Sequence, residues 1–140
     1  MKKIVKKVVA MMMAGGMLLS MSGSDVFAKG NYTDALFTCF AVPSTTKYIS
    51  PREKLDATSA TVKLTQAVTP VTVRVYGSSS DTGTAYNCTY GTPKVVGVSD
   101  KYTYLPNLVK ERNYRYARLG FSHSGSSNVI LIGWWSPDSI

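Results

Sequence analysis

The chain contains one histidine, His123, which is the first candidate for acid–base chemistry. In a Ser/His/Asp triad a carboxylate orients the imidazole, but the sequence has no acidic residue between Glu111 and Asp138. Pairing through the fold with Asp81 or Asp100 is the alternative. We expect instead that His123 is a solvated histidine in a Gly/Ser loop.

The acidic residues give no second route to catalysis. A glycosidase requires two carboxyl groups that face each other across a cleft, whereas the acidic residues here are scattered and stand beside Lys, Arg or turn residues. The sequence contains no Gly-rich phosphate loop and no spacing typical of metal ligands. We therefore predict a protein that is not an enzyme, with no catalytic residue, no metal and no cofactor.

Tyrosine and arginine supply a candidate binding surface, because rigid aromatic side chains beside Arg are typical of interface hot spots. The same residues are ordinary strand partners, since Tyr favours β structure. Trp134 and Trp135 are consecutive, so on a strand they face opposite sides. The candidate surface comprises Tyr102, Tyr104, Tyr114, Arg115, Tyr116, Arg118, Trp134 and Trp135.

The first 28 residues have the pattern of a secretory signal peptide. Four lysines precede an uncharged stretch over residues 8–21, which is shorter than the roughly 20 apolar residues of a membrane-spanning helix. Val26-Phe27-Ala28 then fits a signal peptidase site. We predict a signal-peptide helix cleaved after Ala28 and a secreted domain over residues 29–140, with an uncleaved membrane anchor as the alternative.

Removal of this leader changes the composition. All six methionines lie in it, and so do four lysines and one aspartate, so the formal net charge falls from +8 to +5 for residues 29–140. Because much of the basicity belongs to the leader, we predict no nucleic-acid partner. The remaining charge gives a weak, salt-screened preference for anionic surfaces. A cell-wall polymer, an anionic membrane surface and a protein stay open as partners.

Two cysteines remain, Cys39 and Cys88. An exported chain meets a non-reducing medium, so we expect them to form a disulfide. Such a bond would close a long loop and stabilise the domain by roughly 4 kcal/mol in the chain-entropy model. The alternative is a pair of buried free thiols.

The remaining pattern predicts short strands with almost no helical periodicity. Residues 58–66 and 71–76 alternate apolar and polar side chains, which is the period of a half-buried strand. Residues 44–56 form a predicted loop, residues 95–98 and 102–105 a predicted hairpin, and residues 108–111 a short helical turn. The other predicted strands are residues 36–42, 114–121 and 129–135, the last buried on both sides. This arrangement favours an all-β, single-domain antiparallel β-sandwich, with a partly closed barrel as the alternative.

Three segments carry a resemblance to a known family: Lys54 to Ala60, Leu105 to Tyr114, and the C-terminal Gly133-Trp134-Trp135-Ser136-Pro137-Asp138-Ser139. They resemble an uncharacterised family of small secreted proteins from Gram-positive bacteria. The resemblance implies a secreted product and no assigned activity. In size, charge and β content alone, the chain is also similar to secreted β-sandwich bacteriocins of the lactococcin type, which no motif supports.

The sequence thus predicts a secreted, extracellular, non-enzymatic binding or interaction module at the bacterial exterior. The alternative is a cationic, bacteriocin-like antibacterial protein that acts on the envelope of competing cells. Wall binding without killing would discard the bacteriocin alternative.

Overall fold

The computed structural model describes residues 30–140, and these residues form strands, turns and loops without a helix. Within this range no helix could cross a membrane. The predicted signal peptide and its cleavage site lie outside the described residues. The strands are β2 (Ala35–Ala41), β3 (Lys47–Tyr48), β4 (Arg52–Glu53), β5 (Ala60–Gln66), β6 (Val71–Ser78), β7 (Tyr86–Asn87), β8 (Lys94–Val96), β9 (Thr103–Leu105), β10 (Tyr116–Ser122) and β11 (Val129–Ser136).

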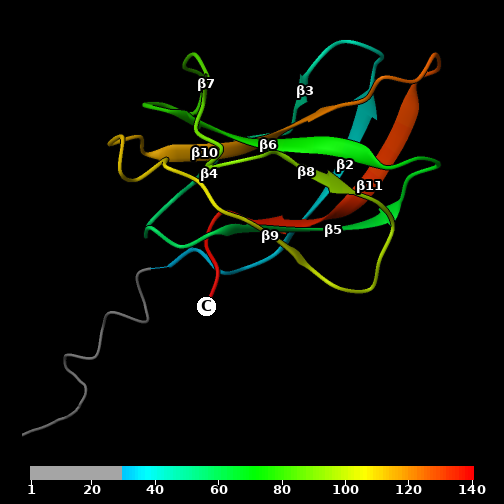
Figure 1. The fold of residues 1–140 in the computed structure, drawn as a ribbon. Helices are drawn as coiled ribbons and strands as arrows, with labels where there is room; N and C mark the ends of the chain where they lie inside the picture. Colours follow the sequence, from blue (N-terminus) through cyan, green and yellow to red (C-terminus); the bar gives the residue numbers. More distant parts are fainter. Residues whose placement is uncertain (1–29) are drawn as a thin grey trace, which may run out of the picture. The chain divides into compact units, whose positions relative to one another are not determined.

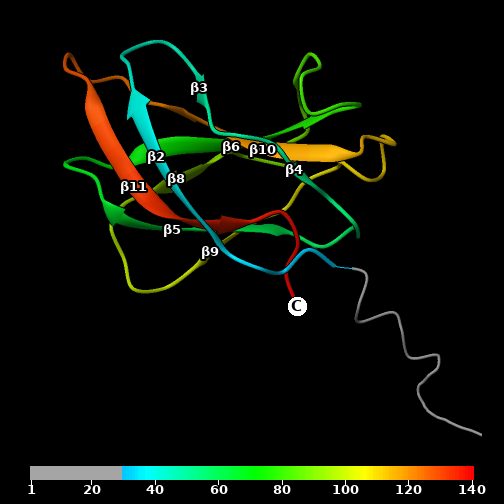
Figure 2. The same ribbon diagram turned by 180° about the vertical axis from the view of Figure 1, so that it is seen from behind.

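These strands form two separate antiparallel sheets, which confirms the predicted sandwich. The six-stranded sheet has the order β3-β10-β6-β7, with β4 also paired to β10 and β8 to β6. The four-stranded sheet has the order β2-β11-β5-β9. Figure 1 shows the layer of β6 and β10 above the layer of β5 and β11, and Figure 2 shows the same two layers from behind.

The core lies between the sheets, where the alternating side chains of each layer meet. The predicted inward sets of β5 and β6 are confirmed, because Val62, Leu64, Val73 and Val75 are all buried. In β10, the alternating residues Ala117, Leu119 and Phe121 are buried as well. Phe121 stacks on Phe37 of the opposite sheet with ring centroids 5.3 Å apart.

Strand β11 corrects the prediction that residues 129–135 are buried on both sides. It is central in its sheet, between β2 and β5. Only one of its faces is buried, however: Leu131 and Trp135 lie in the core, whereas Ile130 and Trp134 are exposed. The apolar run therefore does not mark a doubly covered strand, because its outer side chains contact solvent.

The predicted hairpin over residues 95–98 and 102–105 is wrong. Strand β8 pairs with β6, and β9 pairs with β5, so the two segments belong to different sheets. The predicted loop over residues 44–56 also contains two short strands, β3 and β4, which both pair with β10. Nothing in their side-chain pattern signals this pairing, because it is made by backbone groups. The predicted turn is present as the Arg112 N–H to Leu108 carbonyl hydrogen bond of 3.0 Å.

The predicted disulfide is absent, although both cysteines lie in the described part of the chain. Cys39 and Cys88 are buried free thiols, which was the alternative interpretation. Cys39 is on β2 near the charge of Lys47, whereas the Cys88 sulfur packs against Gly77 near the charge of Arg112, so they occupy different parts of the core. Burial raises the pKa of each thiol above its ordinary value, which keeps it protonated and unreactive.

Candidate functional site

The outer side of the four-stranded sheet carries large apolar side chains that are exposed. Leu36 faces Trp134, and Phe40 faces Ile130, in cross-strand pairs between β2 and β11. These four side chains are 37–60% exposed. We call this set of four residues the apolar face. The pair Thr38–Ile132 lies between these two pairs, with Thr38 exposed and Ile132 half-buried. Exposed apolar patches on a small soluble domain are typical of interaction sites.

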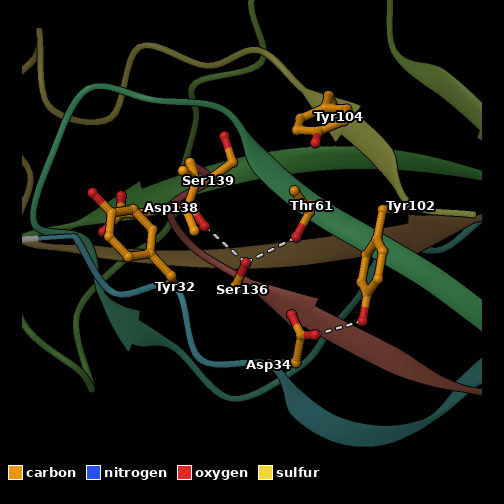
Figure 3. Close-up of a pocket in the computed structure, with 9 residues that line it drawn as sticks. Tyr32, Asp34, Thr61, Tyr102, Tyr104, Ser136, Asp138 and Ser139 are labelled. Carbon is orange, nitrogen blue, oxygen red and sulfur yellow. Dashed lines mark hydrogen bonds between the residues drawn. The ribbon is translucent and has the colours of Figure 1, made fainter. Parts of the chain in front are cut away.

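A hollow of about 190 Å³ lies at the same sheet, and we call it the tyrosine hollow. Figure 3 shows tyrosine rings around a floor made by the hydroxyls of Thr61 and Ser136. Thr61 is paired in register with Tyr104 of β9 and with Ser136 of β11, which is why these side chains meet. The hollow is lined by Tyr32, Asp34, Thr61, Tyr102, Tyr104, Ser136, Asp138, Ser139 and Ile140.

Hydrogen bonds fix the direction in which the hydroxyl groups of the floor point. Ser136 Oγ donates to the backbone oxygen of Asp138 at 2.8 Å and lies 2.8 Å from Thr61 Oγ1. Because a serine hydroxyl has one proton, Thr61 must be the donor to Ser136. Thr61 then presents only acceptor lone pairs to the hollow.

Tyr102 connects the tyrosine hollow to charges of both signs. Its hydroxyl donates to Asp34 Oδ2 at 2.5 Å, as Figure 3 shows, and Lys63 Nζ lies 4.9 Å from its ring centroid. The hydrogen bond to Asp34, with smaller contributions from burial and from the Asp34 charge, raises the pKa of Tyr102 from 10.0 to about 12. Lys63 is also the register partner of Trp134, so the hollow and the apolar face adjoin.

A buried ion pair supports one wall of the hollow. Lys54 Nζ and Asp138 Oδ1 are 2.8 Å apart, and both side chains are fully buried. Lys54 also donates to the backbone oxygens of Thr58 and Pro137, each at 2.6 Å. Burial lowers the pKa of Lys54, and the hydrogen bond with Asp138 opposes that shift.

The second oxygen of Asp138 holds backbone N–H groups from other segments. Asp138 Oδ2 accepts from the N–H of Asn31 at 2.7 Å and of Leu55 at 2.9 Å. The C-terminal segment and the Lys54 to Ala60 segment, both singled out in the sequence, therefore meet here. Lys54 and Asp138 therefore hold these two segments together and are not accessible to a ligand. The accessible part of this region is the tyrosine hollow.

The structure divides the candidate surface that the sequence predicts. Tyr102 and Tyr104 line the tyrosine hollow, and Trp134 lies on the apolar face. Trp135 is 2% exposed and belongs to the core, so the two tryptophans face opposite sides as predicted.

The other predicted residues lie on β10 of the six-stranded sheet or directly before it. Tyr116 and Arg118 alternate with the buried residues of β10 and therefore point outward. Arg115 pairs with Glu53 at 2.7 Å on the surface. Tyr114 stacks on Tyr86, with ring centroids 5.7 Å apart, and packs against the core. The structure does not bring these four residues to the tyrosine hollow.

His123 is buried, which corrects the prediction of a solvated histidine. It is 9% exposed because Pro43 and Ser44 pair with its backbone at the end of β10. Its Nδ1 accepts a hydrogen bond from the N–H of Gly125 at 3.1 Å, so the neutral ring carries its proton on Nε2. Nε2 has no hydrogen-bond partner among the described residues.

Several residues of the site do not appear among the sequence candidates: Leu36, Phe40, Ile130, Tyr32 and Asp34. A signal for part of this set is present in β2, where Leu36 and Phe40 alternate with the inward-facing Phe37 and Cys39. A strand with one solvated face normally alternates apolar with polar residues. Large apolar residues on both faces of β2 thus indicate that its outer face, as well as its core face, makes an apolar contact.

The fold and site define a small antiparallel β-sandwich domain with an apolar outer face and an adjoining polar hollow. The chain belongs to the family described as "Protein of unknown function (DUF2712)", which matches residues 24–139. This family membership agrees with the resemblance to an uncharacterised domain family. No curated protein matches the chain.

Proposed function

We propose that this protein is a non-enzymatic binding module at the bacterial exterior, exported after removal of residues 1–28, that docks on an anionic lipid surface through the apolar face. The observation that carries the proposal is the exposure of the two cross-strand pairs Leu36–Trp134 and Phe40–Ile130 on one sheet surface. The secreted, Gram-positive origin belongs to the same proposal. It is supported by the leader pattern and by the resemblance.

The apolar face is large enough for reversible membrane binding. Complete burial of one such side chain stabilises by about 1.5–3 kcal/mol. Because the four side chains are 37–60% exposed, docking would contribute roughly 1 kcal/mol for each of them. The sum of roughly 4 kcal/mol is about tenfold in affinity below the marginal, reversible anchoring by a single acyl chain, so basic residues must supply the rest.

The aromatic residues beside the apolar face, together with Lys63, favour lipid over other partners. Trp and Tyr are enriched at the membrane–water interface, where Trp134, Tyr102 and Tyr104 would lie. Each Lys or Arg near an anionic leaflet contributes about 1 kcal/mol, and residues 29–140 carry a formal charge of +5. Lys63 stands beside Trp134 on the same surface.

Co-sedimentation with lipid vesicles tests the proposal. Protein purified from the culture medium, with a mass that corresponds to a chain beginning at Lys29, is mixed with phosphatidylglycerol/phosphatidylcholine vesicles. Phe40→Thr combined with Ile130→Thr should weaken binding at least about tenfold, because two apolar contacts are lost. The matched control is Val95→Thr on β8, an exposed apolar residue of the other sheet, which should bind as the wild type does.

Three results would overturn the proposal. Equal binding by the double variant and the wild type would remove the apolar face from the contact. Self-association that the double variant abolishes, without any binding to vesicles, would assign the face to a second copy of the chain. Absence of the processed chain from the medium would contradict export.

The cationic charge and the apolar face also support the alternative function, a bacteriocin-like antibacterial protein. Both functions require the same lipid contact, so vesicle binding does not separate them. Exposure of neighbouring bacterial strains to the purified protein does. Killing that depends on Phe40 and Ile130 would favour the antibacterial function. Binding to vesicles without killing of bacteria would favour the binding module.

A further inference from the structure

The tyrosine hollow has a hydrogen-bonding polarity of its own. Tyr32 donates its proton to Asp56 Oδ2 at 3.1 Å, and Tyr102 donates to Asp34 Oδ2 at 2.5 Å. Thr61 donates to Ser136, and Ser136 donates to the Asp138 backbone, as derived above. Each of these four hydroxyl groups has used its only proton. At these four hydroxyls the hollow therefore offers acceptors, which suit a ligand that donates. The hydroxyls of Tyr104 and Ser139 also line the hollow and form no hydrogen bond among the described residues.

Charge and ring surface point to the same chemistry. Three tyrosine rings line the hollow, and the faces of aromatic rings attract cations. Asp34 adds a carboxylate, and among the described residues it forms no ion pair with a cationic side chain. The other carboxylate, Asp138, is neutralised by Lys54. Among the side chains that line the hollow, Asp34 is thus the carboxylate without an ion-pair partner in the described part of the chain.

Size limits the ligand. The hollow measures about 190 Å³, which is below the roughly 300–1,000 Å³ of pockets for drug-sized molecules. It suits one small group, such as the end of a lipid headgroup.

Lys63 provides the opposite charge beside the same tyrosine, Tyr102. Asp34 contacts the hydroxyl end of Tyr102, while Lys63 Nζ lies over the ring of the same residue. A small zwitterion that places its cation at Asp34 could place its anion at Lys63. The two charges thus match an ammonium group joined to a phosphate by a short linker.

We propose that the tyrosine hollow binds a primary ammonium group, and that its ligand is the phosphoethanolamine headgroup of a membrane lipid. The lipid source rests on the proposed function. The preference for an ammonium donor rests on the hollow alone. A primary ammonium fits better than a quaternary one because its N–H groups can satisfy the acceptors of Thr61, Tyr102 and Asp34.

Binding of soluble probes tests the chemistry without a membrane. Ethanolamine and O-phosphoethanolamine are titrated into the purified protein while the tyrosine ring resonances are followed by NMR. Both should shift the resonances of Tyr102 and Tyr104. Asp34→Asn should weaken both probes about tenfold or more, because the carboxylate is lost. Asp81→Asn, which removes an exposed carboxylate outside the hollow, is the matched control and should change neither.

Lys63→Met separates the two ends of the ligand. It should weaken O-phosphoethanolamine and leave ethanolamine unchanged or slightly tighter, because a neighbouring positive charge is removed. Tighter binding of inorganic phosphate than of ethanolamine would overturn the proposal, since the hollow would then prefer an anion. Equal binding of ethanolamine by the wild type and Asp34→Asn would overturn it as well.

Vesicles then test the lipid source. Replacement of phosphatidylcholine by phosphatidylethanolamine, at constant phosphatidylglycerol, should increase the affinity of the wild type and not that of Asp34→Asn. If soluble ethanolamine binds but no vesicle does, the proposed lipid-binding function fails, and the proposal that the hollow binds a primary ammonium group stands. If vesicles bind through Phe40 and Ile130 but ethanolamine does not bind, the hollow proposal fails and the function stands.

Discussion

At the residue scale, the pair Lys54–Asp138 determines how the C-terminal segment is held. The two residues are 84 positions apart in the sequence, and neither has a neighbour that reveals the other. Both residues lie in segments that carry the resemblance to an uncharacterised family. The ion pair itself could not be predicted from the sequence, because it forms only when the fold brings the two segments together. A buried charge that loses its partner is strongly destabilising.

We therefore expect Asp138→Asn and Lys54→Met each to lower the free energy of unfolding by about 3–5 kcal/mol, because each leaves a buried charge uncompensated. Urea denaturation followed by circular dichroism measures this loss. The matched control is Glu53→Gln, which breaks the exposed pair with Arg115 and should cost less than about 1 kcal/mol. Equal, small effects of all three variants would contradict the structural role of the buried pair.

Tyr102 gives a second prediction at this scale. The pKa of Tyr102 is raised to about 12 in the folded protein. Between pH 10 and 12 the Tyr102 hydroxyl is therefore protonated in the folded state and ionised in the unfolded state. The stability from the Tyr102–Asp34 contact is complete below pH 10 and is lost as the pH rises towards 12. Ultraviolet difference spectra should show one tyrosine that ionises about two pH units late, and Asp34→Asn should shift it back towards 10. Unchanged titration in that variant would remove Asp34 as the cause.

At the element scale, periodicity predicts the long strands well, because side chains on β5, β6 and β10 alternate between core and solvent. It predicts little about strands that are held by backbone pairing alone. Strands β3 and β4 each have two residues, and both attach to β10 without an apolar pattern. Sequence proximity also fails to predict the partners of β8 and β9. These neighbouring strands belong to different sheets, because β8 pairs with β6 and β9 pairs with β5.

Gly133 provides the test at this scale. The register between β11 and β5 shifts between Ile132 and Gly133, and a Cβ at position 133 would overlap the backbone oxygen of Lys63. Gly133→Ala should destabilise the protein by more than about 2 kcal/mol, because β5 must move away. Gly97→Ala is the control, since its Cβ would meet only Pro70 at an ordinary distance, and it should change stability by less than about 0.5 kcal/mol. Thermal melts compare the two.

At the scale of the whole molecule, the division of the candidate residues follows from strand pairing rather than from sequence distance. Tyr102, Tyr104 and Trp134 gather on one sheet, although 30 residues separate Tyr104 from Trp134. Tyr116 and Arg118 are closer to Tyr104 in the sequence and belong to the other sheet. Composition identified the aromatic residues, whereas the long-range pairing of β11 with both β2 and β5 decided which of them share a surface.

The central claim is that the apolar face enters a lipid surface, and the fluorescence of Trp134 tests it most directly. The protein has two tryptophans, of which Trp135 is in the core and Trp134 is on the face. Addition of phosphatidylglycerol vesicles that carry a bromine quencher in the upper acyl chain should blue-shift and quench the Trp134 emission. Trp134→Phe, which leaves only Trp135, should show neither change. Emission that is unaltered by saturating vesicles in the wild type would contradict the account.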